Sequence, residues 1–371
     1  MPGEHGRRGE KRGELMVIRG RAPLRVSFGG GGTDVAPFCV EQGGAIIGST
    51  INKYAYCSIV PRDDDQIIVH SLDFDMTVKY NTKENYVYDG RLDLVTAALK
   101  AMDIKQGCEV YLQCDAPPGS GLGTSSTVMV ALLTAMAKWK GVEMDSYAMA
   151  DLAYKVERED LKIDGGYQDQ YAATFGGFNF IEFHGRNNVV VNPLRIKKEV
   201  IHELQYNLLL CYTGNIHISA NIIKDQVKNY EKKDPFDAMC EVKALAYAMK
   251  DELLKGNLYS FGKLLDYGWK SKKRMSSKIS TPHIDELYEE ALKAGALGGK
   301  LLGAGGGGFL LVYCPYNVRH KVAARMEAAG GQLTDWNFEL RGAQAWINDE
   351  KRWNYEEIKV AIPGGEYHFP L

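Results

Sequence analysis

The alternation of apolar and polar residues predicts β-strands through the first third of the chain. Stretches rich in β-branched and aromatic residues cover positions 17–28, 44–60 and 66–80, and stretches of this kind favour strands. A helix is expected at 93–102, followed by a further strand at Cys108–Cys114. The segment after Cys114 should therefore open onto the edge of a sheet.

The pattern then changes to helical spacing. Residues 127–140 are largely apolar and end at Gly141, and a second helix is expected at 147–161 with Asp145 as its N-cap. On that second helix Glu157 falls beside the apolar stripe. A buried carboxylate needs a positive partner, and either an arginine or lysine side chain or a metal ion would supply it.

The second half of the chain mixes helices and strands. Helices are expected at 220–229, 238–255, 282–294 and 317–329, and strands at 178–183, 203–212 and 332–338. A chain of 371 residues exceeds what one hydrophobic core usually organises, and the polar segment Arg195–Lys198 is the expected domain boundary. The expected organisation is a disordered or tag-like arm at 1–15, an N-terminal domain at 16–195 and a C-terminal domain at 196–371.

The segment 115–126 carries the clearest chemical signal, because Gly119, Gly121 and Gly123 stand within five residues before a helix. Glycines let backbone amides approach a ligand, and the N–H groups and positive dipole at a helix start favour phosphate. A Walker loop needs a lysine where Gly123 stands, and a dinucleotide loop needs a glycine where Thr124 stands. We therefore expect a polyphosphate-binding loop of another kind, with a plain strand-to-helix turn as the alternative.

Two other segments are rich in glycine. Residues 29–32 are four glycines that follow a strand and precede Thr33 and Asp34. This arrangement leaves room for a ligand, although a flexible turn is the alternative. The second segment, 303–308, precedes an apolar strand, which indicates that its backbone packs closely against another surface.

Asp169 and a basic run are further candidates. Asp169 lies between two glutamines, and we interpret it either as a base or orienting group at a reaction centre or as an ordinary acid at a helix end. The run 269–274 is basic, and such runs usually form a solvated face. If the substrate carries its own phosphate, the residues expected to hold it are Lys270, Lys272, Lys273 and Arg195.

The composition excludes some partners. A formal charge of -2 gives no support for a nucleic-acid or membrane-surface partner. Seven scattered cysteines without a CxxC pattern read as reduced thiols of a cytoplasmic protein. No apolar run approaches the ~18 residues of a membrane span, and the histidines lack metal-ligand spacing. The sequence leaves a homodimer open.

Three segments in this order, 22–34, 118–126 and 300–309, resemble the three motifs of the GHMP kinase family. The resemblance extends from residue 17 to about 340. It implies an α+β fold of two domains, the first like the second domain of ribosomal protein S5 and the second ferredoxin-like. It also implies that ATP and substrate meet in the cleft between the two domains.

The resemblance assigns roles to individual residues. Asp169 matches the acid that takes or orients the hydroxyl proton, and Arg25 matches the basic residue beside the transferred phosphoryl group. Glu157 and Ser125 match positions that hold Mg²⁺ with ATP, although Thr124 or Ser126 could replace Ser125. ATP is expected to bind the loop Pro118, Gly119, Ser120, Gly121, Leu122, Gly123, Thr124, Ser125 and Ser126. The substrate is expected to contact Gly31, Gly32, Thr33, Asp34, Gly166, Gly305, Gly306, Arg195, Lys270 and Lys273.

Within the family, the segments around Gly31–Asp34, 157–160 and 168–177 most resemble D-glycero-D-manno-heptose 7-phosphate kinases. Galactokinases carry Glu-His where Gly31 and Gly32 stand, which implies room for a bulkier sugar here. The implied reaction is ATP-dependent phosphorylation of C1 of a heptose 7-phosphate. L-fucose kinases share the glycine-rich version and are the alternative, and a non-catalytic sugar or nucleotide sensor on the same scaffold is the alternative from another class.

Overall fold

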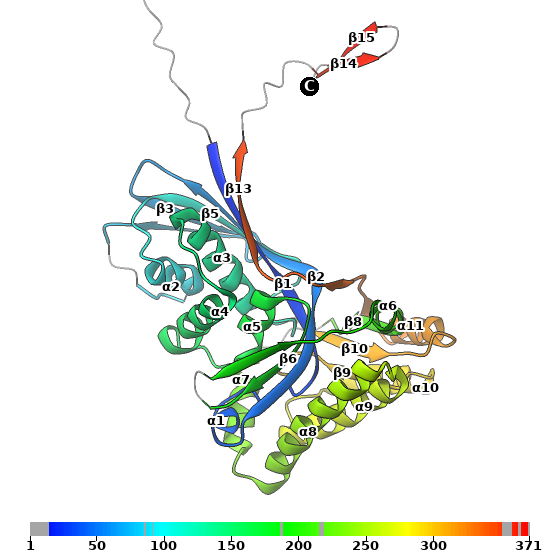
Figure 1. The fold of residues 1–371 in the computed structure, drawn as a ribbon. Helices are drawn as coiled ribbons and strands as arrows, with labels where there is room; N and C mark the ends of the chain where they lie inside the picture. Colours follow the sequence, from blue (N-terminus) through cyan, green and yellow to red (C-terminus); the bar gives the residue numbers. More distant parts are fainter. Residues whose placement is uncertain are drawn as a thin grey trace, which may run out of the picture.

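The computed structural model describes residues 15–84, 87–90, 92–185, 188–214, 219–350, 358–362 and 365–369. The expected arm at 1–15 lies outside this range except for residue 15. Figure 1 shows the chain as two sheets with their helices, and the first sheet contains both the earliest and some of the latest described strands.

The first sheet has a central path of strands in the order β13-β1-β2-β5-β3-β4. All pairs are antiparallel except β3 with β5. Three shorter strands join it through β2 and β6. The strands are β1 (Leu15–Gly29), β2 (Gly44–Pro61), β3 (Gln66–Ser71), β4 (Met76–Asn81), β5 (Cys108–Cys114), β6 (Phe178–Phe183), β7 (Val189–Pro193), β12 (Phe338–Glu339) and β13 (Gln344–Glu350).

The helices beside this sheet cover one of its faces. Apolar residues of α2, α3 and α4 form a buried cluster with residues of β1, β2, β3 and β5. The helical segments of this part are α1 (Phe38–Glu41), α2 (Asp93–Ala101), α3 (Thr124–Lys140), α4 (Ser146–Tyr154), the π-helical turn η1 (Lys155–Asp160) and α5 (Gln168–Phe175). The expected cap is present, because the Ala148 N–H donates to Asp145 Oδ1 at 2.8 Å.

The second sheet is antiparallel, in the order β11-β8-β10-β9. Its strands are β8 (Leu208–Tyr212), β9 (Gly298–Leu301), β10 (Phe309–Tyr313) and β11 (Gln332–Leu333). Its helices are α6 (Lys198–Asn207), α7 (Ser219–Asn229), α8 (Lys233–Lys255), α9 (Leu258–Met275), α10 (Pro282–Lys293) and α11 (Arg319–Ala328). A separate hairpin pairs β14 (Ile358–Ile362) with β15 (Gly365–Phe369).

Three of the predicted strands differ in the structure, and the one expected over 332–338 is two short strands, β11 and β12, of different sheets. The prediction of one strand over 203–212 was wrong, because α6 runs to Asn207 and β8 begins at Leu208. Val200, Ile201 and Leu204 follow helical spacing and pack on one core, a pattern that the strand prediction overlooked. The predicted strand 66–80 is a hairpin of β3 and β4.

The chain also returns to the first sheet after completing the second. β12 pairs with β2, and β13 pairs with β1. The expected C-terminal domain, 196–371, therefore supplies strands to the sheet of the expected N-terminal domain, 16–195.

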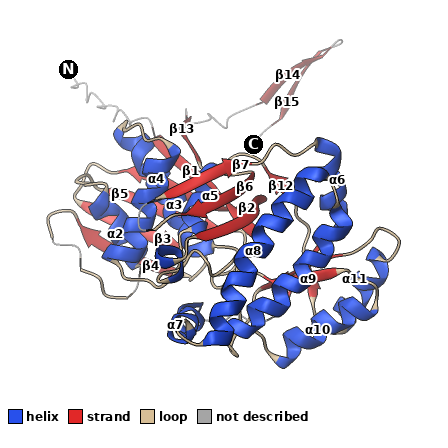
Figure 2. Ribbon diagram, turned by 60° about the horizontal axis from the view of Figure 1, so that its bottom comes forward, coloured by secondary structure: helices blue, strands red, loops and turns tan. Residues whose placement is uncertain are grey.

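One buried cluster joins the two parts of the molecule. It contains Leu24, Val26 and Phe28 of β1 together with residues of β8 and α9 such as Leu210 and Phe261. Figure 2 shows α2–α4 on one side of the molecule and α8–α11 on the other, with β1, β2 and β6 between them. This shared core fixes the end of β1 against α9, and the candidate site lies at that junction.

Candidate functional site

The phosphate-loop candidate packs directly against the third glycine-rich segment. A Cβ atom at Gly121 would lie 2.5 Å from the Leu302 carbonyl oxygen, and one at Gly303 would lie 2.5 Å from Gly121 Cα. No residue but glycine allows so close an approach. The expectation that segment 303–308 packs closely on another backbone is confirmed, and the surface it meets is the loop before α3.

The pocket described by the structure includes most of this loop. Its lining contains Gly119, Gly121, Gly123, Thr124, Ser125 and Ser126. Leu122 instead enters the shared core, and its carbonyl accepts a hydrogen bond from the Arg25 N–H at 3.1 Å. Ser120 is buried beneath the loop, where its carbonyl accepts from Phe309 N–H at 3.1 Å. Pro118 does not line this pocket. Ser120 and Leu122 support the loop from beneath, while its glycines and hydroxyl groups face the ligand space.

Arg25 and Asp169 form an ion pair in the middle of the pocket. Arg25 Nε and Nη2 lie 2.8 and 2.7 Å from the same oxygen, Asp169 Oδ1. Along β1 the side chains of Leu24 and Val26 enter the shared core, so the strand's alternation turns Arg25 to the opposite side. A Cβ at Gly123 would lie 3.2 Å from Asp169 Cγ. The carboxylate therefore stands directly against the start of α3.

Asp34 is a second carboxylate in the pocket and is almost fully buried. It accepts hydrogen bonds from the Gln168 N–H at 3.1 Å, from Gln168 Nε2 at 3.2 Å and from the Gly32 N–H at 3.2 Å. Burial and then the nearby Asp169 charge raise the pKa of Asp34 above its usual value. A Cβ at Gly166 would lie 1.9 Å from Asp34 Oδ2, so the glycine there makes room for the carboxylate.

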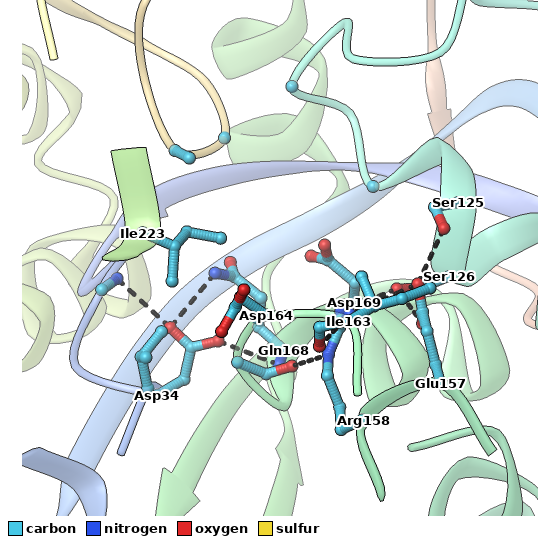
Figure 3. Close-up of a pocket in the computed structure, with 18 of the residues that line it drawn as sticks. Asp34, Ser125, Ser126, Glu157, Arg158, Ile163, Asp164, Gln168, Asp169 and Ile223 are labelled. Carbon is cyan, nitrogen blue, oxygen red and sulfur yellow. Dashed lines mark hydrogen bonds and ion pairs between the residues drawn. The ribbon is translucent and has the colours of Figure 1, made fainter. Parts of the chain in front are cut away.

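Glu157 is fully buried at the other end of the pocket, beside the start of α3 (Figure 3). Its oxygens accept from Ser125 Oγ at 2.7 Å, from Ser126 Oγ at 2.6 Å and from Gln170 Nε2 at 2.6 Å. Arg158 adds a longer ion pair at 3.4 Å. Glu157 lies in the π-helical turn that follows α4, and such turns occur frequently at functional sites.

The structure brings one lysine of the basic run into the pocket. Lys272 lines it, is 4% exposed and donates to the Gly303 carbonyl. Lys270 and Lys273 instead pair with Asp266 at 2.7 Å and Asp285 at 3.0 Å, outside the pocket lining. Arg195 is exposed and is also absent from that lining.

Of the other residues expected to contact the substrate, some lie at the pocket and others lie outside it. Gly32 lines the pocket, and Gly31 lies directly beside Lys272. Thr33 is buried, and its hydroxyl donates to the Gly30 carbonyl at 2.7 Å, so it holds the loop in shape. Gly305 and Gly306 pack against Ile279 and do not line the pocket, where Gly303 and Ala304 lie instead.

Sequence reasoning missed several residues in or near the pocket. Lys300 of β9, which donates to the Ser27 carbonyl at 2.8 Å, was not proposed as a site residue. Gln168 and Gln170 were treated only as neighbours of Asp169, although they hold the two buried carboxylates. The sequence did contain a signal that Lys272 points inward, because Leu265, Trp269 and Lys272 follow helical spacing. All three are buried in the structure.

Comparisons with known proteins agree with this arrangement. Residues 85–177 match the GHMP kinases N terminal domain, and residues 249–332 match the GHMP kinases C terminal domain. The chain is 36% identical over 337 residues to D-glycero-alpha-D-manno-heptose 7-phosphate kinase of Campylobacter jejuni, which covers 90% of this chain and 99% of that protein. The chain belongs to the GHMP kinase family.

Other relatives of this GHMP kinase include sugar kinases as well as mevalonate kinases. A crystal structure of a D-glycero-D-manno-heptose 1-phosphate kinase from Bacteroides thetaiotaomicron has a TM-score of 0.75 at 32% identity, over 89% of this chain and 98% of that one. L-fucokinase/L-fucose-1-P guanylyltransferase of Bacteroides fragilis is 26% identical over 80% of this chain, but the match spans 34% of that protein. Galactokinase of Lactococcus lactis, at 18% identity and a TM-score of 0.72, covering 88% of this chain and 95% of that one, shares the fold.

The described part of this GHMP kinase contains no helix that is both long and apolar enough to span a membrane.

Proposed function

We propose that this GHMP kinase transfers the γ-phosphoryl group of ATP to the C1 hydroxyl of D-glycero-D-manno-heptose 7-phosphate. The observation that carries the proposal is the pocket itself, in which the loop before α3, the Arg25–Asp169 pair and the buried Asp34 lie together. The similarity to the Campylobacter jejuni heptose 7-phosphate kinase supports the choice of substrate.

The chemistry assigned to Asp169 follows from its two oxygens. Both contacts from Arg25 go to Oδ1, which leaves Oδ2 for the substrate hydroxyl. As the sugar oxygen forms a bond to the γ-phosphorus, Oδ2 accepts its proton, and the bond from that phosphorus to the β-γ bridging oxygen breaks to release ADP. An anomeric hydroxyl is more acidic than an ordinary alcohol, so this carboxylate needs no unusual basicity.

In this scheme Arg25 both orients Asp169 and stabilises charge on the transferred phosphoryl group. Its guanidinium stands between Asp169 and the loop, where charge on the transferred group develops, and it orients the carboxylate by a two-donor contact. Phosphoryl transfer depends mainly on positioning and charge stabilisation. A fixed cation at this point meets both needs.

The residues near Glu157 fit a magnesium ion bound with ATP. Mg²⁺ in nucleotide sites uses one or two protein oxygens with phosphate oxygens and water, and the Glu157 carboxylate and the Ser125 hydroxyl are adjacent oxygen donors at the start of α3. The described residues contain no group of three or more His, Cys, Asp or Glu able to hold a metal without a substrate. When bound, the ion would neutralise phosphate charge.

Asp34 is the proposed ligand of sugar hydroxyls. Its carboxylate is held by Gln168 and by the Gly32 N–H. Because its surroundings are buried, a hydroxyl that donates to it replaces little water and gains orientation. The sugar would then lie between Asp34 and Asp169.

Coupled ADP release tests the proposal. The panel is heptose 7-phosphate, heptose 1-phosphate, unphosphorylated heptose, L-fucose, galactose and mevalonate, each with Mg·ATP. Highest kcat/KM for the 7-phosphate, with ³¹P NMR showing a new phosphate at C1, is the expected result. Preference for the 1-phosphate would mean that the reacting hydroxyl is on another carbon. Preference for L-fucose would mean that the substrate is L-fucose and not the heptose phosphate. ADP release that no sugar increases would favour a sensor.

A further inference from the structure

Two buried lysine amines meet at the position where Gly31 lacks a side chain. Lys272 Nζ and Lys300 Nζ lie 3.8 and 3.9 Å from the point that a Cβ at Gly31 would occupy, and Ser27 Oγ lies 3.8 Å from it. The two lysines are each 4% exposed, and Ser27 is 3% exposed. Three polar groups from β1, α9 and β9 therefore converge on one point.

This cluster forms no ion pair among the described residues, although the buried Asp34 carboxylate is an electrostatic neighbour of both lysines. Each amine donates to a backbone carbonyl instead. Ser27 Oγ is buried without a hydrogen-bond partner among the described residues. Buried charges and polar groups are costly unless paired, so the arrangement is incomplete without an anion.

The electrostatics of the two amines agree with that geometry. Burial and then repulsion from Arg25 lower the pKa of Lys272 to about 8, and burial together with Lys272 and Arg25 lowers that of Lys300 well below its usual value. Asp34 partly offsets these effects. An anion at the cluster would favour the protonated form of both amines and so would be bound with charge-assisted hydrogen bonds.

We propose that Lys272, Lys300 and Ser27 form a phosphate subsite beside Gly31, and that it holds the phosphate monoester already present on the sugar. This assignment rests on the proposed function and specifies how that site selects its substrate. It replaces the surface residues Lys270, Lys273 and Arg195 as the group that binds this phosphate.

The position of the cluster favours the sugar's phosphate over the transferred one. Both lysines have Arg25 and, with a smaller effect, Asp34 among their electrostatic neighbours. The cluster is assigned to the sugar side because Gly31 belongs to the glycine segment that leads into Asp34. Asp169 and the α3 loop, which mark the reaction centre, meet at Gly123. A sugar that presents C1 to Asp169 and lies along Asp34 would direct its opposite end, which carries the 7-phosphate, towards Gly31.

Kinetics of charge variants test the subsite. Lys272→Met and Gly31→Glu are each expected to raise KM for heptose 7-phosphate by about 10- to 100-fold, because charge-assisted hydrogen bonds to a phosphate are lost. KM for ATP and for unphosphorylated heptose should change by less than about twofold. The matched control is Lys270→Met, a same-charge change two residues away on α9, which should leave KM for the phosphorylated sugar as in wild type.

The Gly31 substitution remains informative if Lys272→Met fails to fold. Its nearest surroundings lie at ordinary contact distance, so a Cβ fits, and Gly31→Ala adds the methyl group without the charge. A rise in KM for heptose 7-phosphate with Gly31→Glu but not with Gly31→Ala supports the subsite. Equal rises for the phosphorylated and unphosphorylated sugars, or no rise in either charge variant, would overturn it.

A binding measurement separates the subsite from the proposed reaction. With the protein saturated by Mg·AMPPNP, inorganic phosphate is expected to raise Tm in wild type and Lys270→Met but not in Gly31→Glu. This result would support the subsite even if no heptose phosphate were a substrate. Absence of the wild-type shift, or an equal shift in Gly31→Glu, would overturn the subsite even if heptose 7-phosphate were turned over.

Discussion

The buried charged groups at the two ends of the pocket differ in the partners that the protein gives them. At one end the Glu157 carboxylate receives hydrogen bonds from Ser125, Ser126 and Gln170. At the other end Lys272 lines the pocket and Lys300 lies near it outside the lining; both are 4% exposed, and each donates to a backbone carbonyl. The first end is satisfied by the protein and keeps its geometry without a ligand. In the proposed subsite an anion completes the second end, so this is the end expected to distinguish one sugar from another.

The largest effect should come from the residue between the two ends. Asp169→Asn removes the proton acceptor but keeps the side-chain shape, so kcat should fall by about 10² or more. Binding of AMPPNP, measured by calorimetry, should stay nearly intact because both ends of the pocket are unaltered. Near-normal turnover in this variant would remove Asp169 from the mechanism.

Substitution of Glu157, at the end of the pocket whose charge is paired within the protein, should alter the Mg²⁺ requirement. In Glu157→Gln the negative oxygen beside Ser125 is lost, so the Mg²⁺ concentration for half-maximal activity should rise about 10- to 100-fold. KM for the sugar should remain close to wild type because the lysine end is unchanged. An unchanged Mg²⁺ dependence would assign Glu157 a purely structural role.

Raising the pH should weaken binding of the phosphorylated sugar at the end of the pocket that contains Lys272, and should leave the Glu157 end unchanged. The pKa of Lys272 is lowered to about 8 by burial and Arg25, with Lys300 and Asp34 also facing it. Lys272 is therefore charged below about pH 8 and loses its charge above it, so kcat/KM for the phosphorylated sugar should fall by up to about tenfold per pH unit there.

Two comparisons isolate the lysine in that pH profile. Lys272→Arg keeps its charge at high pH and should flatten the alkaline decrease. Unphosphorylated heptose should show no such decrease in wild type. An alkaline decrease that persists with Lys272→Arg would belong to another group.

The smallest effect is expected on the outer face of α9. Lys273→Met breaks a half-exposed pair with Asp285 and a cation–π contact with Trp269 at 5.6 Å, and such exposed interactions contribute little. KM values should therefore change by less than about twofold in the same ADP-release assay. A selective increase in KM for heptose 7-phosphate would bring the surface lysines back as phosphate ligands.

Local patterns were sufficient to predict the parts of the site that depend on neighbouring residues. The glycines before α3, the Asp145 cap and the strand Cys108–Cys114 all follow from residues close in sequence. The resemblance to the GHMP kinases gave the fold, which the comparisons confirm. The roles of Asp169, Arg25 and Glu157 stay predictions, although the structure brings these residues into one pocket.

Contacts between distant segments could not be read from the sequence in the same way. A run of basic residues does not reveal which lysine faces inward until the face of α9 is known, and only Lys272 of that run lies in the pocket. The meeting of Lys272 with Lys300 depends further on how α9 and β9 pack on β1. The pairing of β13 with β1 likewise joins residues more than three hundred positions apart.

That last pairing has a consequence for synthesis on the ribosome. β1 lies inside the finished sheet, between β2 and β13, but until residues 344–350 emerge one side of β1 is an open edge. At the usual elongation rate this interval is on the order of half a minute. The strand that carries Arg25 is thus exposed to wrong partners for most of translation, and chaperone demand should fall sharply once β13 leaves the exit tunnel.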